Sequence, residues 1–317
     1  MNPKRIMFAF TGAAILAALI ITFGAHKSHA ASIKSGTLLR LAAANVSASQ
    51  NFSPINVCAS CLTQPFGINE SGLITGTYFD ADGAPHGFLL RGGNYVNIDV
   101  PDSLFVEAAK SNDAGAIAGD YVAQDGIDRP FVRDRFGNLI FKSGFPGATV
   151  TYGVKVNNQG SLLGGYTLDP SGATGFHGYI LTGIDFTTFD YPGANVTSTF
   201  PLDMNEVGTI VGSYKTTTEG EEHGFMRSAQ GVFTQIDFPG SVQSEAFGIN
   251  AAGDIVGRYL GTDGHHHGFL LHSGTFTSIA YLSPNTYAWG INSRGTIVGY
   301  SFADSPSGPI NGFKLGS

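Results

Sequence analysis

Apolar and polar residues alternate in short runs along most of this chain, and the same set of runs returns at a nearly constant spacing. In the clearest copy, four runs rich in β-branched and aromatic residues are bounded by Gly, Asp, Asn or Ser, at 245–250, 254–259, 267–272 and 275–280. Such runs predict β-strands joined by tight turns. No segment after residue 31 keeps an apolar period of 3.6 residues, so few helices are expected.

The copies share the pattern Asn-x-x-Gly-x-(Ile/Leu)-x-Gly at spacings of 43, 45, 48, 45 and 42 residues. They begin at Asn69, Asn112, Asn157, Asn205, Asn250 and Asn292. Asn at the first position and Gly at the fourth suit a type I turn that ends in a left-handed glycine. The pattern therefore predicts an all-β fold, a six-bladed β-propeller of four-stranded antiparallel blades. A stacked solenoid is the alternative.

The two ends of the repeat region favour a closed ring. The last copy ends at Ser317 after its third run, so its fourth run is missing. The segment 52–57 resembles the fourth run at 233–238, and each lies 17 residues before the Asn of the next copy. We therefore expect 52–57 to form an N-terminal strand that completes the last blade, which removes an open sheet edge.

The motif Gly-Ile-Asn-x-x-Gly-x-Ile-Val-Gly occurs at 248–257 and 290–299, and His-Gly-Phe follows the repeat motif at His86, His223 and His267. With these motifs the chain resembles HAF-type repeats of secreted bacterial proteins, which are named for a His-Ala-Phe motif. The resemblance covers roughly residues 52–317; Gly replaces the Ala, and two copies lack the His. It implies an extracellular location and a propeller-like fold, and no particular reaction.

The first 30 residues have the organisation of a secretory signal peptide. Lys4 and Arg5 form a basic start, residues 6–25 are apolar, and small residues precede a cleavage point after Ala30. The apolar run is about long enough to span a bilayer, so an uncleaved anchor is the alternative.

After the signal peptide, residues 31–51 lack the repeat and are expected to form a tether, and 52–317 form the propeller. Removal of residues 1–30 takes away three basic residues and no acidic one, which changes the formal net charge from −7 to −10. Such an acidic chain is a poor partner for nucleic acid or anionic membranes. We expect a secreted monomer, extracellular or periplasmic, with no cofactor and with an extracellular glycan or protein as partner.

Cys58 and Cys61 are the only cysteines. Their C-x-x-C spacing is compatible with a disulfide, a redox motif or half of a zinc site. A redox motif needs a following helix, whereas a strand is predicted at 66–69, and zinc needs two more ligands. In an exported protein we expect a disulfide that stiffens the ring where it closes.

Residues that differ from the repeat pattern are the first candidates for a functional site. Two positions before the Asn, three copies have Gly, whereas the middle copies have Lys110, Lys155 and Asp203. The first strand of each blade is expected to line the central channel, where charges need partners. These residues are candidates for binding a small anionic or polar ligand, and a structural Lys–Asp network is the alternative.

A second set of candidates lies five positions before the Asn. The set includes Glu107, Tyr152, Glu245 and Tyr287. We expect these residues around the channel mouth, where aromatic rings and carboxylates can bind a sugar by stacking and hydrogen bonding. The alternative is that they are ordinary residues of the rim.

Metal sites are less well supported. His265, His266 and His267 are metal ligands by type, but neighbours on a strand point to opposite faces. The segments 80–83 and 262–264 resemble fragments of calcium loops, but they lack the full set of oxygen ligands. Turn formation explains them more simply, and no metal is expected.

Connections after the second and fourth strands vary in length, so we expect a site on the face that they form. A binding module is the favoured function, because no catalytic motif is found. A hydrolase or lyase that uses Lys110, Lys155, Asp203 or Glu107 is an alternative, and a purely structural protein is another. An apolar plug in the channel would argue against the enzyme, and converging titratable groups would favour it.

Overall fold

The computed structural model describes residues 51–169, 171, 174–218, 221–305 and 308–316. The predicted signal peptide and nearly all of the predicted tether lie outside these residues. All regular elements within the described part are β-strands, which confirms the all-β prediction. That part contains no helix with the length and apolar character needed to cross a membrane.

Each copy of the repeat forms consecutive antiparallel strands. The first copy gives β2 (Leu62–Ile68), β3 (Ile74–Phe79), β4 (Pro85–Arg91) and β5 (Asn94–Ile98). The strands of the other copies are β6 (Ser103–Ser111), β7 (Ile117–Ala123), β8 (Asp128–Arg133), β9 (Leu139–Phe141), β10 (Val150–Val156), β11 (Leu162–Thr167), β12 (His177–Thr182), β13 (Asp185–Phe189), β14 (Val196–Met204), β15 (Ile210–Thr216), β16 (Glu222–Arg227), β17 (Phe233–Ile236), β18 (Ser244–Ile249), β19 (Ile255–Leu260), β20 (His266–His272), β21 (Thr275–Ile279), β22 (Asn285–Ile291), β23 (Ile297–Phe302) and β24 (Ile310–Leu315).

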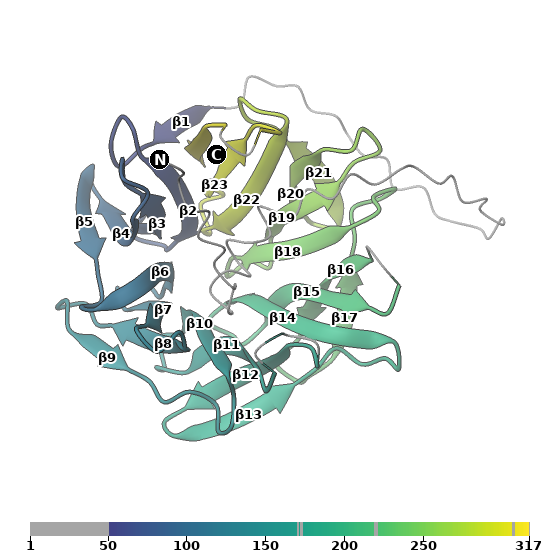
Figure 1. Ribbon diagram of the computed structural model, residues 1–317. Helices are drawn as coiled ribbons and strands as arrows, with labels where there is room; N and C mark the ends of the chain where they lie inside the picture. Colours follow the sequence, from purple (N-terminus) through teal and green to yellow (C-terminus); the bar gives the residue numbers. More distant parts are fainter. Residues whose placement is uncertain (1–50, 170, 172–173, 219–220, 306–307, 317) are drawn as a thin grey trace, which may run out of the picture.

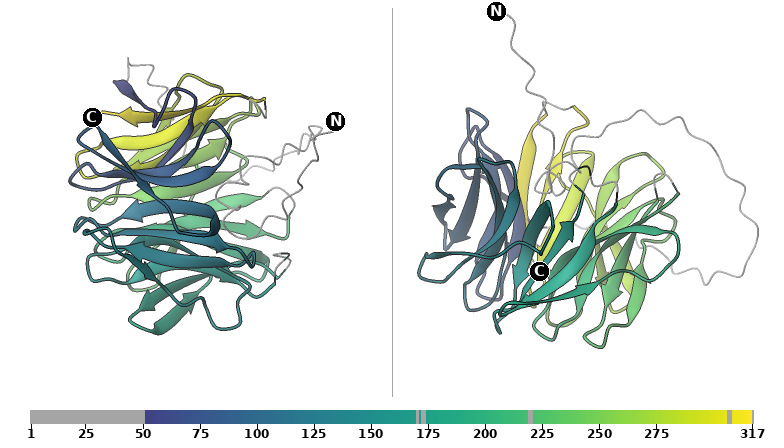
Figure 2. Two further views of the ribbon diagram at one scale, coloured as in Figure 1. Left: turned by 60° about the vertical axis from the view of Figure 1, so that its left-hand side comes forward. Right: turned by 60° about the horizontal axis from the view of Figure 1, so that its bottom comes forward.

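The sheets surround one centre and form a β-propeller (Figure 1), and Figure 2 shows the ring from two further directions. In the part of the chain that the structure describes, four sheets have four strands each, and a fifth has eight. In the eight-stranded sheet, β6–β9 and β10–β13 are joined by parallel pairing at Lys155↔Lys110 and Val150↔Asp128. The expectation of separate four-stranded sheets is therefore wrong here, because two innermost strands lie close enough for their backbones to pair.

The ring closes as the sequence predicts. β1 (Phe52–Ile55) pairs antiparallel with β24, with Ile55 opposite Gly312, and forms the fourth strand of the last sheet. The predicted disulfide between Cys58 and Cys61 is present directly after β1, with 5.1 Å between the Cα atoms. Both features lie where the two ends of the repeat region meet.

The Asn-x-x-Gly segments form the turns between first and second strands. In the first copy, the Gly72 N–H donates to the carbonyl of Asn69 at 3.0 Å, and Asn69 Oδ1 accepts the N–H of Leu73 at 2.9 Å. Gly72 has φ 82°, in the left-handed region that glycine adopts without a steric penalty. The same backbone bond and a positive φ occur at the other five turns, which confirms the turn prediction.

Aromatic rings of the third strands fill the space between sheets. Phe88 is completely buried, and a Cβ atom added at Gly76 would lie 2.8 Å from its ring and 2.1 Å from the carbonyl of Gln64. The last Gly of the repeat motif is therefore needed for close packing. The equivalent rings are also fully buried: Phe131, Tyr179, Phe225, Phe269 and Phe313.

Candidate functional site

The six repeat turns meet around the central axis on one face, called here the turn face. Asn Nδ2 atoms donate to the backbone carbonyl of the next repeat Asn, as from Asn69 to Asn112 at 2.8 Å and from Asn292 to Asn69 at 3.3 Å. Three further links join Asn112 to Asn157, Asn205 to Asn250, and Asn250 to Asn292. The repeat Asn thus serves its own turn through Oδ1 and the neighbouring turn through Nδ2.

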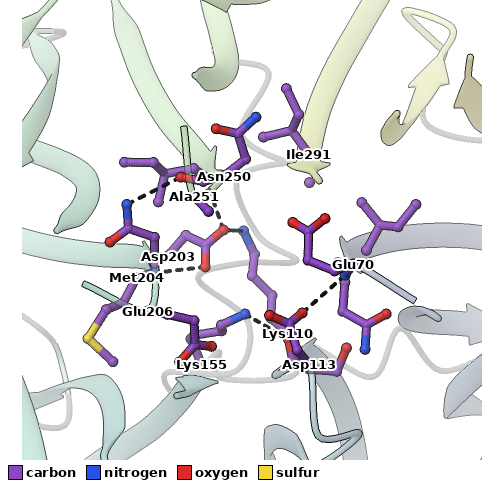
Figure 3. Close-up of a pocket in the computed structure, with 17 residues that line it drawn as sticks. Glu70, Lys110, Asp113, Lys155, Asp203, Met204, Glu206, Asn250, Ala251 and Ile291 are labelled. Carbon is purple, nitrogen blue, oxygen red and sulfur yellow. Dashed lines mark hydrogen bonds and ion pairs between the residues drawn. The ribbon is translucent and has the colours of Figure 1, made fainter. Parts of the chain in front are cut away.

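A pocket lies at the centre of this face (Figure 3). The candidates Lys110, Lys155 and Asp203 all line it, together with Glu70 and Glu206. The structure therefore brings the three departures from the repeat together. It places them on the turn face, so the expectation of a site on the opposite face of variable loops is wrong for this pocket.

Lys110 crosses the centre of the ring from β6. Its Nζ atom donates to Asp203 Oδ2 at 3.0 Å and to the carbonyls of Phe247 at 2.5 Å and Trp289 at 3.0 Å. An ammonium group has three N–H donors, so these partners saturate it. Burial lowers the pKa of Lys110, and the Asp203 carboxylate opposes that effect. Lys110 therefore serves as a fixed internal cation, as the structural-network alternative predicted.

Asp203, the other member of this ion pair, is also held by backbone N–H groups. Its Oδ2 also accepts the N–H of Ile249 at 3.2 Å, and its Oδ1 accepts the N–H of Met204 at 2.8 Å. Neither oxygen is left without a partner for a ligand or a proton-transfer step.

Lys155 has fewer hydrogen-bond partners than Lys110. It is half-buried, and its Nζ donates to the carbonyl of Ser111 at 2.7 Å. No carboxylate forms an ion pair with it among the residues that the structure describes. Two N–H donors and a positive charge therefore remain at the pocket wall.

Carboxylates surround the opening of the pocket. Glu70 Oε1 accepts the N–H of Ser293 at 2.8 Å, and Glu206 Oε2 accepts the N–H of Asn158 at 2.8 Å. Asp113 Oδ1 likewise accepts the N–H of Glu70 at 3.1 Å. Each carboxylate is oriented through one oxygen, and its second oxygen makes no hydrogen bond within the described part of the chain.

A layer of apolar side chains fills the centre of the ring next to Lys110. Phe66, Leu202, Phe247 and Trp289 belong to one buried cluster, and the Phe247 and Trp289 rings stack with centroids 4.0 Å apart. Each occupies the bulge three positions before a repeat Asn, on an innermost strand. The recurrence of a large apolar residue at this repeat position is a signal in the sequence from which the layer could have been predicted.

Glu107 and Tyr152 lie inside the protein and not at an open mouth. They are 2% and 3% exposed, so the expected sugar-binding rim is wrong for both. Burial, with the nearby Asp120 charge, raises the pKa of Glu107 well above its usual range. Burial also raises the pKa of Asp120 to about 7, which a hydrogen bond with Asp128 opposes.

Glu245 and Tyr287 are also buried, at 2% and 1% exposed. Glu245 forms an ion pair with Arg258, and Arg258 donates to the Tyr287 hydroxyl while its guanidinium lies 4.6 Å from that ring's centre. Burial raises the pKa of Glu245 to about 7, against the opposing charge of Arg258. These residues connect neighbouring sheets and are closed to a ligand.

The recurring His residues pair with Asp residues. His86 Nδ1 lies 2.8 Å from Asp99, and His223 Nδ1 lies 2.8 Å from Asp237. His267 contacts Asp263 at 3.0 Å, within its own loop. No group of three metal-ligating side chains with suitable geometry occurs in the described residues.

No protein-family model matches the sequence, and no curated protein shows significant similarity. Solved structures with a similar fold include a mutant of AofleA from Arthrobotrys oligospora, at 11% identity and TM-score 0.52, covering 84% of this chain and 86% of that chain. A putative gluconolactonase has 13% identity and TM-score 0.50, with 84% and 93% covered. An acylaminoacyl peptidase has 10% identity and TM-score 0.50, with 80% and 44% covered. At these identities the likeness shows a β-propeller fold and no more.

Proposed function

We propose that this protein is a secreted six-bladed propeller of the HAF-type repeat class that binds a small polar ligand in the turn-face pocket. The blade count treats the eight-stranded sheet as two blades, because β6–β9 and β10–β13 each contain one whole repeat. The secretory signal in the sequence and the Cys58–Cys61 disulfide support export.

The proposal rests on the Lys155 ammonium group, which has one hydrogen-bond partner among the described residues. An ammonium group with free donors, held half-buried in a pocket, favours an anionic group on the ligand. The carboxylates of Glu70, Asp113 and Glu206 at the opening can accept hydrogen bonds from hydroxyl groups. A sugar that carries one carboxylate, such as a uronic acid unit of an extracellular glycan, combines both features.

Binding is favoured over catalysis by what surrounds the pocket. Lys110 and Asp203, the groups that an enzyme would use there, hold each other and the backbone. The apolar layer of Phe66, Phe247 and Trp289 closes the ring beside them. Titratable groups do converge on this pocket, which is the one observation in favour of a hydrolase or lyase. The saturated Lys110–Asp203 pair and the apolar layer weigh against it, so binding is the preferred function.

A glycan array with residues 31–317 tests the proposal, with uronate-containing and neutral glycans compared. We expect binding to uronate-containing glycans, and Lys155→Met should weaken it at least about tenfold, as loss of a charge-assisted hydrogen bond implies. Lys142→Met, a half-buried lysine outside the pocket, is the matched control. Absence of any glycan binding would favour the structural role, and equal binding by Lys155→Met would place the ligand elsewhere.

A further inference from the structure

Three consecutive repeats present a large apolar side chain near the tip of the outer hairpin on the turn face. Phe136 after β8, Ile184 after β12 and Val232 after β16 are 77%, 89% and 63% exposed. The equivalent hairpins of the first and fifth repeats have only Gly92–Gly93 and Ser273–Gly274. Phe136 precedes the turn glycine, and Ile184 and Val232 follow it, so the three share a hairpin and not one repeat position. Single exposed apolar residues need no explanation, but one in the same hairpin of three consecutive repeats does.

These tips share one face for a topological reason. In a four-stranded antiparallel sheet, the turns after the first and third strands lie at the same end. The innermost strands β6 and β10 are parallel, so neighbouring repeats point their turns the same way. Phe136, Ile184 and Val232 therefore project from the face that contains the Asn turns.

Basic side chains accompany two of the tips. The Arg135 guanidinium lies 4.7 Å from the centre of the Phe136 ring, and Arg133 precedes the same turn. Arg227 precedes the turn before Val232, with its guanidinium 4.9 Å from the Phe189 ring. An apolar tip beside a guanidinium matches the region where lipid chains meet phosphate headgroups.

The acidic surplus of the chain is concentrated at the opposite end of the strands. The connections there carry many carboxylates, among them Asp80, Asp82, Asp99, Asp125, Asp190 and Asp263. A strand of six residues is about 20 Å long, and the Debye length at physiological salt is about 8 Å. The turn face is therefore screened from most of that charge. It has acidic residues of its own, with Asp134 and Asp185 beside the tips and Glu70, Asp113 and Glu206 around the central pocket.

We propose that the turn face of this protein docks on a phospholipid membrane, with Phe136, Ile184 and Val232 entering the interface. The tips come from three separate hairpins, and a flat lipid surface can receive all of them at once. A protein partner would need a matching depression for each. Arg133, Arg135 and Arg227 bind headgroup phosphates, so anionic lipid strengthens docking. This proposal departs from the expectation based on net charge alone, because these arginines lie at the tips.

Flotation with phosphatidylcholine vesicles, with and without phosphatidylglycerol, tests this proposal on residues 31–317, which lack the signal segment. We expect binding that increases with phosphatidylglycerol. Each of Phe136→Ser, Ile184→Ser and Val232→Ser should lower the partition coefficient about fivefold, and the triple variant should not bind.

The matched control removes exposed apolar residues from the opposite end of the strands, with Leu168→Ser, Val242→Ser and Leu282→Ser combined. This control should bind like the wild type. Failure of the wild type to bind either vesicle, or an equal loss in the control, overturns the proposal. Thermal unfolding of each variant verifies that the substitutions leave the fold intact. No variant changes a residue that lines the glycan pocket, so the two proposals can fail separately, although the pocket and the tips lie on the same face.

Discussion

The side-chain Nδ2 atom of Asn292 donates a hydrogen bond to the backbone carbonyl of Asn69, although 223 positions separate them in the sequence. The Oδ1 atom of Asn292 meanwhile accepts the N–H of Thr296 at 3.1 Å. One amide therefore holds its own turn and joins the last repeat to the first. Pairing of β1 with β24 closes the same boundary at the outer side of the ring.

Asn292→Asp tests the link between repeats. Aspartate keeps the oxygen that accepts the Thr296 N–H, but it cannot donate to Asn69. Because Asn292 is 1% exposed, we expect the free energy of unfolding to fall by about 1–3 kcal/mol. Urea unfolding measures this, with Asn94→Asp on an exposed hairpin as the control. Equal, small effects at both positions would show that the link contributes little.

Lys110→Met removes the internal cation and leaves the Asp203 carboxylate buried without a counter-charge. Breaking a buried ion pair in this way costs about 3–5 kcal/mol of stability. The double variant Lys110→Met/Asp203→Asn should recover part of the loss, because no buried charge remains. Chemical denaturation provides the measurement. A cost no larger than that of Lys155→Met would contradict the buried ion pair.

The buried carboxyl groups of Glu107 and Asp120 predict a pH dependence. They are register partners on β6 and β7, and Asp128, Tyr152 and Tyr179 face them from β8, β10 and β12. In the unfolded chain their protons leave near pH 4. In the folded protein, burial raises the pKa of Asp120 to about 7 and that of Glu107 well above its usual range.

Between about pH 4 and 7 the folded state therefore holds more protons than the unfolded state, so these groups make stability fall as pH rises. The expected slope is about 1.4 kcal/mol per pH unit for each retained proton. Unfolding free energies of the wild type and Glu107→Gln, measured across this range, isolate the contribution. Glu107→Gln should lose stability less steeply, and identical slopes would refute the assignment.

Loss of the disulfide should lower stability by a modest amount. The bridge between Cys58 and Cys61 closes a very short loop, for which the chain-entropy model gives about 2 kcal/mol. Cys58→Ser/Cys61→Ser and reduction of the wild type should lower the melting temperature similarly. An unchanged melting temperature for the serine variant, against the oxidised wild type, would show that the bridge does not stiffen the closure.

Much of the architecture could be predicted because it depends on local chemistry. The left-handed Gly72 and the Asn69 side chain form a turn within a few residues, and the same turn recurs in every copy of the repeat. Closure by the segment 52–57, of which 52–55 form β1, could be predicted because a missing strand at one end matched an extra strand at the other. Pairing between β6 and β10 could not, because it depends on how closely two innermost strands approach.

The candidate site, too, could be predicted only in part from the sequence. Comparing the copies selected Lys110, Lys155 and Asp203, and these residues do line one pocket. Their separate roles depend on which groups each Nζ atom can reach. Lys110 Nζ donates to groups on β14, β18 and β22, whereas within the described residues Lys155 Nζ donates only to the Ser111 carbonyl. Glu107, Tyr152, Glu245 and Tyr287 were expected at the rim, but neighbouring sheets bury them.

By itself, the sequence determined the strands, the turns, the repeat and the way the ring closes, because hydrophobic alternation and turn residues act over a few positions. Tertiary structure decided which face contains the pocket and which charge is free in it. It also decided that the apolar tips and the acidic surplus lie at opposite ends of the strands. Those outcomes depend on distances between residues that are far apart in the chain, which no local pattern records.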